Sequence, residues 1–306
     1  MKIILFGGSG FIGSHVADKL SEAGHKVTIF DLKPSPYLQE SQIFIQGDFL
    51  DPEKVNKAVV GQDVIYNFAG IADIEEANKS PLNTIKTNIV GCANLLEAAK
   101  NNHVKRFVFA STLYVYSETG SFYRCTKQAC ELLIEEYQRR FGIDFTILRY
   151  GSLYGLRADE SNWVFHILKQ ALTERKVIRY GDGQELREYI HVEDAARCSV
   201  KILDDEYKNQ GVIISGHQQI KICDLLVMIK EIMGNDIEIE YCPVDENALH
   251  YEITPYTFKP RLARRVLVDS YMDLGQGVME VLSHIYKNDF PHTKHNGIFI
   301  KKEQVK

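Results

Sequence analysis

The chain has 306 residues, which is long enough for one large domain or two modest ones. Its hydrophobic fraction of 45% and charged fraction of 25% are those of an ordinary globular protein, and its net charge of −5 argues against a broad nucleic-acid-binding face. No apolar run reaches the roughly 20 residues that cross a membrane, and the six cysteines contain no C-x-x-C pair. We therefore expect a cytoplasmic protein with reduced thiols and no metal site, whose partners are neither nucleic acid nor membrane.

The first predicted strand, residues 2–6, leads through a glycine-rich turn into a helix predicted over 11–23. The three glycines of the turn have the G-x-x-G-x-x-G spacing that binds dinucleotides when it joins a strand to a helix. The first glycine permits the tight turn, the second lets the backbone approach a pyrophosphate, and the third lets the helix pack against the strand. N–H groups at the helix N-terminus then bind the anion. The predicted cofactor contacts in this turn are Gly7, Gly10, Phe11, Ile12 and Gly13.

The second predicted strand, residues 26–31, ends in an acid, Asp31. A carboxylate in that place accepts hydrogen bonds from an adenosine ribose, and its charge repels a 2′-phosphate. We therefore expect NAD as the cofactor in preference to NADP.

Apolar strands and amphipathic helices alternate through the first half of the chain. Further strands are predicted near 43–46, 63–68, 105–110 and 144–149, and further helices near 52–59, 81–101 and 123–141. This alternation predicts an α/β fold, a Rossmann-type doubly wound parallel sheet with helices on both faces. Ligands in such sheets bind beyond the carboxyl ends of the strands, so functional residues are expected just after the strands.

A tyrosine and a lysine lie four residues apart where the helix near 123–141 begins. This spacing puts Tyr123 and Lys127 on one helical face. A nearby ammonium favours the phenolate, so Tyr123 could act as a base below the ordinary tyrosine pKa of about 10. The strand near 105–110 leads into Ser111 and Thr112, whose hydroxyls could bond a substrate oxygen or the Tyr123 phenol.

After residue 150 the alternation loosens into helices near 162–172, 192–204, 222–233 and 271–287 with short strands between them. We expect a smaller C-terminal α/β portion that binds the substrate and covers the cofactor cleft. The predicted division is a cofactor-binding domain with the catalytic residues (1–150), a substrate-binding portion (151–290) and a tail (291–306).

The run His191-Val192-Glu193-Asp194 has the composition of a metal site or an acid/base cluster. Its acids precede a predicted helix, however, and negative charge stabilises a helix N-terminus. We therefore interpret the run as structural.

Short motifs stand at the strand ends: GGSGFIG, NFAG, FASTLYVY, YRCTK and LRY. Together with Asp31 they resemble the extended short-chain dehydrogenase/reductases, over roughly residues 1–285. The segment YGDGQELREYIHVEDAA resembles the nucleotide-sugar epimerase and dehydratase branch of that family. The resemblance implies that NAD oxidises a sugar hydroxyl, usually at C4, while a nucleoside diphosphate anchors the substrate.

The resemblance also implies roles for matching positions. Tyr123 would remove the hydroxyl proton, Lys127 would hold the nicotinamide ribose and lower the pKa of Tyr123, and Thr112 would take the place of the catalytic Ser/Thr. Asn88 would order the strand ends, although an amide on the helix surface is an equal alternative. The further cofactor contacts implied are Asp48 and Phe49 at the adenine, Ala69 and Gly70 at the backbone approach, and Asn88, Ser111 and Tyr150.

Substrate contacts follow from the same resemblance. Arg187 would bind the diphosphate, as suits a bidentate guanidinium. Asn162 matches a phosphate-contacting asparagine, or else is a helix N-cap. One arginine among Arg261, Arg264 and Arg265 would reach the nucleotide, or else these three residues form a solvated charge run. The predicted substrate-binding set is Ser152, Asn162, Arg187 and Arg261.

Departures from the family pattern narrow the reaction. The 4,6-dehydratases carry Asp-Glu after the catalytic Thr, as the acid and base for water elimination. This chain has Leu113 and Tyr114 there, which disfavours dehydration. The 3,5-epimerases need a further acid/base pair, often with a Cys, and no Cys occupies this loop. The loop from Tyr116 to Tyr123 is short, and Gly151 suggests room for a bulkier sugar.

We expect a nucleotide-sugar 4-epimerase that oxidises C4 transiently, resembling UDP-glucose 4-epimerase. The first alternative is a 4-dehydrogenase (an oxidase) that releases the 4-keto sugar and recycles NADH with a second substrate. The second alternative is a non-catalytic NAD-binding sensor. The helices near 81–101 and 123–141 resemble those that pair between subunits in this family, so a homodimer is expected.

Overall fold

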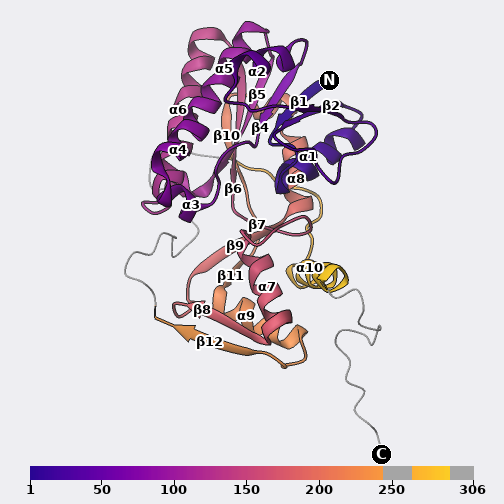
Figure 1. Ribbon diagram of the computed structural model, residues 1–306, viewed down its shortest axis with the longest axis vertical. Coiled ribbons are helices and arrows are strands. Elements are labelled where there is room, and N and C mark those ends of the chain that lie inside the picture. The colour runs from indigo at the N-terminus through magenta and orange to yellow at the C-terminus, as the bar shows by residue number, and fades with distance from the viewer. Residues whose placement is uncertain (244–263, 290–306) are drawn as a thin grey trace, which may run out of the picture.

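An eight-stranded parallel sheet forms the centre of the larger lobe of the computed structural model, which describes residues 1–243 and 264–289 (Figure 1). Its strands are β1 (Lys2–Phe6), β2 (Lys26–Asp31), β3 (Ile43–Gln46), β4 (Val64–Asn67), β5 (Arg106–Thr112), β6 (Asp144–Tyr150), β10 (Gln210–Ile214) and β13 (Arg264–Arg265). They lie in the order β13-β10-β6-β5-β4-β1-β2-β3. The chain builds outward from β1 to one side and then, from β4, to the other. The predicted Rossmann-type fold is confirmed, and its topological switch point lies between β1 and β4.

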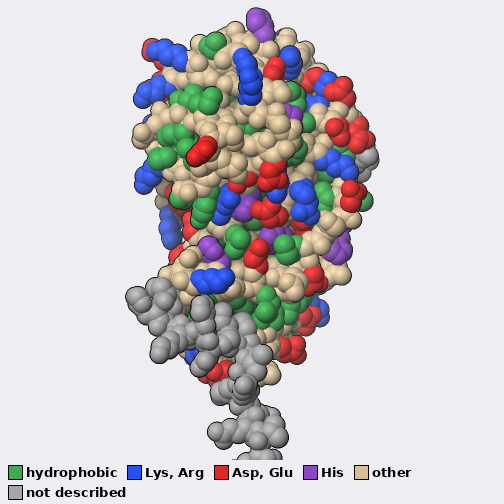
Figure 2. Space-filling model, turned by 90° about the vertical axis from the view of Figure 1, so that its right-hand side faces the viewer, with side chains coloured by type: hydrophobic (Ala, Val, Ile, Leu, Met, Phe, Trp, Pro, Cys, Tyr) green, Lys and Arg blue, Asp and Glu red, His purple; other side chains and the backbone are tan. Residues whose placement is uncertain are grey.

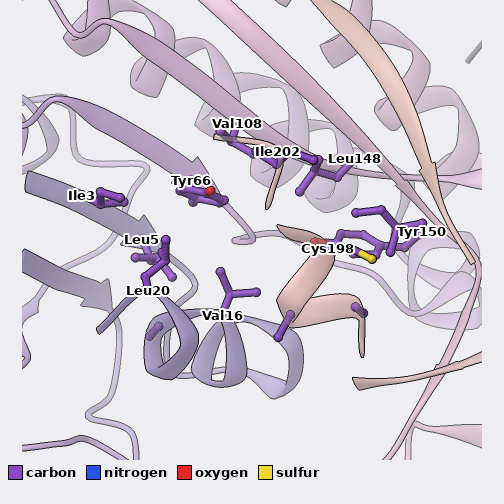
Figure 3. Packing of buried hydrophobic residues seen from close by; sticks show 14 of the residues in the cluster. Ile3, Leu5, Val16, Leu20, Tyr66, Val108, Leu148, Tyr150, Cys198 and Ile202 are labelled. Atoms are coloured by element: carbon purple, nitrogen blue, oxygen red, sulfur yellow. The ribbon is translucent and has the colours of Figure 1, made fainter. Parts of the chain in front are cut away.

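Helices cover both faces of this sheet because its buried strands are apolar on both faces. On one face lie α1 (Phe11–Glu22) and α8 (Val192–Lys201), and on the other lie α2 (Pro52–Val59), α5 (Gly91–Asn101) and α6 (Ser121–Phe141). Along β1, Ile3 and Leu5 enter the core under α1 and α8 (Figure 3), whereas Ile4 and Phe6 enter the core under the other helices. This alternation fixes the register of the strand.

The helix predicted over 81–101 is interrupted. It consists of α4 (Pro81–Ile85), a π-helical turn (Lys86–Val90) and α5, and a short helix that the sequence did not predict, α3 (Ile74–Lys79), precedes it. A 3₁₀ turn (Leu113–Tyr116) follows β5 and leads toward α6. Both irregular turns lie at the carboxyl ends of strands, where the ligand site is expected.

The smaller lobe has its own sheets and core (Figure 1). Its elements are β7 (Ser152–Tyr154), α7 (Trp163–Glu174), β8 (Lys176–Tyr180), β9 (Leu186–His191), β11 (Gln219–Lys221), α9 (Ile222–Ile232), β12 (Glu238–Cys242) and α10 (Leu274–Asp289). Strands β11, β9 and β7 form one sheet, and β8 pairs with β12. Leu168, Leu225 and Leu282 are fully buried in the core between α7, α9 and α10.

A boundary at residue 150 separates the two lobes only in part. β10 and β13 extend the main sheet beside β6, and α8 packs on α1, so the chain returns to the larger lobe after β9. A 3₁₀ turn (Asp205–Tyr207) joins α8 to β10. Within the described ranges, no helix is long and apolar enough to cross a membrane.

Candidate functional site

The turn between β1 and α1 packs tightly against the end of β4. Gly7 has a φ of +78°, and a Cβ on it would lie 2.5 Å from the amide nitrogen of Ala69. A Cβ on Gly13 would lie 2.2 Å from the carbonyl oxygen of Gly7. Both positions therefore require glycine, because a side chain would push the turn away from the sheet.

Gly10, in contrast, borders open space. Apart from its chain neighbours, the one described heavy atom within 4 Å of a Cβ on Gly10 would be the Gly7 carbonyl oxygen, at 3.4 Å. Gly10 caps α1 without a side-chain hydrogen bond, and the N–H groups of Phe11 and Ile12 belong to the first turn, where intrahelical partners are lacking. An open surface at the positive end of a helix fits the pyrophosphate of a dinucleotide.

Asp31 stands beside this turn. Its carboxylate accepts hydrogen bonds from the backbone N–H groups of Ser9 (3.0 Å) and Leu32 (2.7 Å). The Ser9 hydroxyl donates to the carbonyl of Lys33 (2.8 Å), which ties the glycine turn to the end of β2. The carboxylate is thus held beside the glycine turn, and its contact with a dinucleotide ribose remains a prediction.

The segment after β3 is held against α5. The Asp48 carboxylate accepts from the N–H of Leu50 (2.9 Å), and the Phe49 carbonyl accepts from Asn94 (3.2 Å). The Phe49 ring lies against Gly91, where a Cβ would come within 2.1 Å of it. Asp48 is exposed and Phe49 is half-buried. Their contact with the adenine remains a prediction.

Asn88 lies in the π-helical turn and joins two parts of the site. Its side-chain oxygen accepts from the N–H of Ile71 (2.8 Å), and its amide donates to the Ile71 carbonyl (3.0 Å) and the Thr126 hydroxyl (2.9 Å). A Cβ on Gly70 would lie 2.7 Å from the same oxygen. Asn88 is 5% exposed, so it is not an amide on the helix surface. It ties the loop after β4 to α6.

Tyr123 and Lys127 lie one turn apart on α6, as their spacing predicts. The Lys127 ammonium donates to the Ala110 carbonyl (2.8 Å) and lies 5.7 Å from the centroid of the Tyr123 ring. It also lies 4.8 Å from the centroid of the Phe109 ring. Lys127 is 6% exposed, and this burial lowers the pKa of its ammonium. A phenolate on Tyr123 would be a suitable counter-charge for it.

Thr112 ends β5 at the same edge of the sheet. Its hydroxyl oxygen accepts from the N–H of Tyr114 (3.2 Å) and so caps the 3₁₀ turn. Helix α6 packs against both β5 and this turn. Thr112, Tyr123 and Lys127 therefore come from neighbouring elements at the carboxyl edge of the sheet, which is the arrangement of a candidate active site.

Ser111 faces away from this edge into a buried polar network. Its hydroxyl donates to Glu131 (2.6 Å), which binds Arg149, and Arg149 in turn donates to the Tyr116 hydroxyl (2.5 Å). Sequence reasoning missed Glu131 and Arg149. Their signal was two opposite charges among apolar residues, Glu131 four residues after Lys127 and Arg149 near the end of a predicted strand.

The side chain of Tyr150 lies in the core beneath α8. Its hydroxyl is hydrogen-bonded to the Ser199 hydroxyl (2.6 Å), and burial raises its pKa. The phenol oxygen is therefore engaged by α8, and a cofactor contact of Tyr150 remains a prediction.

The predicted substrate-binding residues lie in the smaller lobe, apart from Arg261, which falls outside the described residues. Ser152 begins β7, and Arg187 lies in β9, where it is 8% exposed and donates to the Leu186 carbonyl (3.0 Å). Asn162 caps α7 by accepting from the N–H of Phe165 (3.2 Å) and donates to the Leu153 carbonyl (2.9 Å). Asn162 is thus an N-cap, and its contact with a phosphate remains a prediction.

The Arg265 side chain, from β13 at the edge of the main sheet, binds protein groups from both lobes. Its guanidinium contacts the Glu188 carboxylate (2.6 Å) and the Ser215 hydroxyl (2.8 Å). Ser215 also approaches Gly151, where a Cβ would lie 2.8 Å from the Ser215 Cβ. The expectation that Gly151 makes room for a bulkier sugar is therefore wrong, because the space beside it is filled by the protein.

The side chains of the run at 191–194 bond other groups of the protein. His191 caps α8, and the buried Asp194 accepts from Arg197 and from the N–H of Met272 (2.8 Å). Glu193 binds His15 (2.7 Å) on α1. No cluster of metal-ligating side chains occurs in the described part of the chain, and all six cysteines are free, three of them buried.

Comparison with known proteins agrees with this geometry. Residues 3–215 match the model of the NAD dependent epimerase/dehydratase family. A curated relative, UDP-N-acetyl-alpha-D-glucosaminuronate decarboxylase of Bacillus cytotoxicus, is 27% identical over 80% of this chain and 84% of its own length.

Two solved structures share the fold over nearly the whole chain. UDP-glucose 4-epimerase of Thermotoga maritima, determined with UDP-glucose, has a TM-score of 0.80 and 26% identity and covers 94% of this chain and 99% of its own. UDP-glucuronic acid 4-epimerase of Bacillus cereus, determined with UDP-glucuronic acid and NAD, has a TM-score of 0.79 and 25% identity with the same coverage.

Proposed function

This chain belongs to the NAD-dependent epimerase/dehydratase family, and from that premise we propose that it is a nucleotide-sugar 4-epimerase. NAD is its cofactor. The dinucleotide would be held by the open Gly10 surface, the N-terminus of α1 and Asp31. When bound, NAD supplies the hydride acceptor.

The chain's own residues would handle the proton and the sugar. Tyr123 removes the proton from the C4 hydroxyl as that carbon is oxidised, and it returns the proton when the alcohol re-forms. Lys127 stabilises the phenolate from one turn away, and Thr112 would bond the same sugar oxygen. Arg187 would bind the diphosphate, as its guanidinium can bond two phosphate oxygens at once.

One observation favours epimerisation over dehydration. Elimination of water in the related dehydratases uses a carboxyl pair at the two positions after Thr112, and this chain has no carboxyl group at either position. Leu113 is fully buried, and the Tyr114 ring packs against Tyr123. Hydride chemistry at one carbon, with Tyr123 as the acid/base group, is what these residues support.

Several relatives and structural neighbours carry names of UDP-sugar enzymes, which supports a UDP-linked sugar as substrate. The experiment is to incubate the NAD-loaded protein with UDP-glucose, UDP-N-acetylglucosamine, UDP-glucuronic acid and dTDP-glucose separately. Absorbance at the NADH band and chromatography of the sugars are followed together. We expect one substrate to give its C4 epimer with little steady NADH, and Tyr123→Phe to lose at least about 100-fold in rate.

Other outcomes assign other activities. Lasting, stoichiometric NADH with a 4-keto product identifies a dehydrogenase, and loss of carbon dioxide from UDP-glucuronic acid identifies a decarboxylase. Tight NAD binding without turnover of any nucleotide sugar identifies a sensor. Each would overturn the epimerase proposal.

The proposal includes a homodimer formed through α5 and α6. Leu132 and Phe141 on α6 are both 53% exposed, and Val90, just before α5, is 47% exposed. Apolar side chains on a pair of neighbouring helices that run in the same direction are suited to burial against a second copy.

A further inference from the structure

The turn between Thr112 and α6 is short and strongly bonded. The Tyr114 carbonyl accepts from the N–H of Ser117 (2.9 Å), and the Ser117 carbonyl accepts from the Arg124 guanidinium (2.8 Å). Gln128 donates to the Val115 carbonyl (2.9 Å). Helix α6 thus holds this turn at two points, which fixes where the side chains of the turn project.

Gly120 makes room for one of these side chains. It has a φ of +100°, and a Cβ on it would lie 2.7 Å from Cδ1 of Tyr114. The backbone at 120 therefore lies directly against the Tyr114 ring, immediately before α6 begins at Ser121. A ring held between its own turn and the start of α6 has little freedom to rotate.

The Tyr114 ring meets Tyr123 edge to face. The ring centroids are 6.3 Å apart and the ring planes are inclined by 74°, a favoured geometry for an aromatic pair. The Lys127 ammonium lies 5.7 Å from the Tyr123 centroid. The Tyr123 ring is therefore set by the backbone of α6, the Tyr114 ring and the Lys127 ammonium.

We propose that Tyr114 is a positioning residue, whose ring holds the Tyr123 phenol at the reacting oxygen and near Lys127. It stands two residues after Thr112, where the related dehydratases carry an acid, so this position would serve orientation here in place of proton transfer. The role in turnover rests on the proposed epimerase function. The packing of the two rings does not.

Two variants separate the ring from its hydroxyl. Tyr114→Phe keeps the edge-to-face contact, and Tyr114→Leu removes it. We expect Tyr114→Leu to lower kcat about tenfold with KM for the nucleotide sugar and Kd for NAD little changed, since a positioned base acts in the transition state. Tyr114→Phe should retain most of the wild-type kcat.

A matched control breaks a second ring pair on the same helix. The rings of Tyr137 and Phe141 lie 5.2 Å apart at the far end of α6. Tyr137→Leu removes that pair by the same change of residue type and should leave kcat unchanged. A kcat for Tyr114→Leu equal to wild type, or a loss in Tyr114→Phe as large as in Tyr114→Leu, would overturn the proposal.

A measurement that needs no substrate tests the positioning role of Tyr114 even if the protein is not an epimerase. The absorbance of tyrosinate is titrated with pH in the NAD-bound protein, and subtracting the Tyr123→Phe curve isolates the ionisation of Tyr123. The same subtraction in the Tyr114→Leu background cancels the loss of the other phenol. We expect the midpoint for Tyr123 to rise in Tyr114→Leu and to stay unchanged in Tyr114→Phe, because only the former releases the ring from Lys127.

An unchanged midpoint in Tyr114→Leu overturns the positioning role whatever the enzyme's substrate is. Absence of turnover by the wild-type protein overturns the proposed function and leaves this titration intact. NAD affinity and the thermal unfolding midpoint establish that each variant is folded. If Tyr114→Leu does not fold, Tyr114→Met provides a flexible apolar side chain without the ring for the same comparison.

Discussion

Glu131 and Arg149 form a bidentate ion pair beneath the candidate site, with Nε–Oε1 and Nη2–Oε2 distances of 3.0 and 2.7 Å. Both side chains are only 4% exposed. The pair joins α6 to β6, and the Ser111 hydroxyl extends it to β5. Charged hydrogen bonds thus link α6, which carries Tyr123 and Lys127, to β5, which carries Thr112. Glu131 lies one helical turn after Lys127.

Glu131→Gln should lower the free energy of unfolding by about 3 kcal/mol, because it leaves the Arg149 guanidinium buried without a counter-charge. Urea unfolding followed by circular dichroism measures this change. Glu136→Gln is the matched control on the same helix, since Glu136 pairs with exposed arginines and should change stability little. Equal losses in the two variants would show that burial of the Glu131–Arg149 pair is not what stabilises the fold.

The sequence predicted the elements whose pattern is local. Apolar runs, the glycine turn and the i, i+4 spacing of Tyr123 and Lys127 depend on neighbours in the chain, and their placement in the described structure agrees. The π-helical turn at Asn88 was not predictable, because it is held by Ile71 and Thr126, both far from Asn88 in sequence. The packing of Gly151 against Ser215 was missed for the same reason. The return of β10 to the main sheet is likewise set by long-range strand pairing with β6.

Asp31 is expected to select NAD over NADP. Its carboxylate is held beside the glycine turn by the N–H groups of Ser9 and Leu32, where it would repel a 2′-phosphate. Asp31→Asn should therefore lower the ratio of the NADP dissociation constant to the NAD dissociation constant by about tenfold. Calorimetric titration with each dinucleotide measures the ratio. Asp48→Asn removes a charge from the neighbouring strand end and should leave the ratio unchanged. A change of equal size there would indicate a general effect of charge.

Glu193 links α8 to α1, and its pKa is lowered to about 2 by a hydrogen bond to His15, aided by Lys19 and opposed by burial. Since this pKa lies below the ordinary value of about 4.5, the ionised form favours folding. The stabilisation is complete above about pH 4.5 and is lost as pH falls toward 2. The stability difference between wild type and Glu193→Gln should thus shrink as pH falls below about 4.5. Urea unfolding at several pH values tests this, and a difference that grows on acidification would contradict it.

If the proposed dimer forms, a charged residue introduced on the exposed face of α6 should lower the molar mass of the protein in solution. Leu132→Glu should give monomers, because a carboxylate would be buried against the second copy. Light scattering coupled to gel filtration measures the mass. Val227→Glu on α9 is the control, since Val227 is 48% exposed in the smaller lobe. A wild-type monomer at micromolar concentration would remove the dimer from the proposal.

Acidic, basic and histidine side chains gather between the two lobes on the face shown in Figure 2. Arg157 joins the smaller lobe to the cofactor-binding lobe. Its guanidinium binds Asp18 on α1 (2.7 Å) and lies 4.3 Å from the centroid of the Tyr37 ring, in the segment that follows Asp31. The adjacent Leu156 carbonyl contacts His15 (3.0 Å). These contacts tie the segment beside the predicted adenosine site to the other lobe.

Loss of this cation should therefore speed the release of NAD. Arg157 has a φ of +65°, so asparagine, which tolerates that conformation, is the replacement that removes the charge without adding backbone strain. Arg157→Asn should raise the NAD dissociation rate about tenfold, since one ion pair and one cation–π contact are lost. Stopped-flow fluorescence during displacement of bound NADH measures the rate. Arg175→Asn is matched in charge and in positive φ (53°), but Arg175 ends α7 in the smaller lobe and its side chain reaches Asp236 there. A similar acceleration in that control would assign the effect to net charge, because the Arg175 side chain pairs with Asp236 in the smaller lobe.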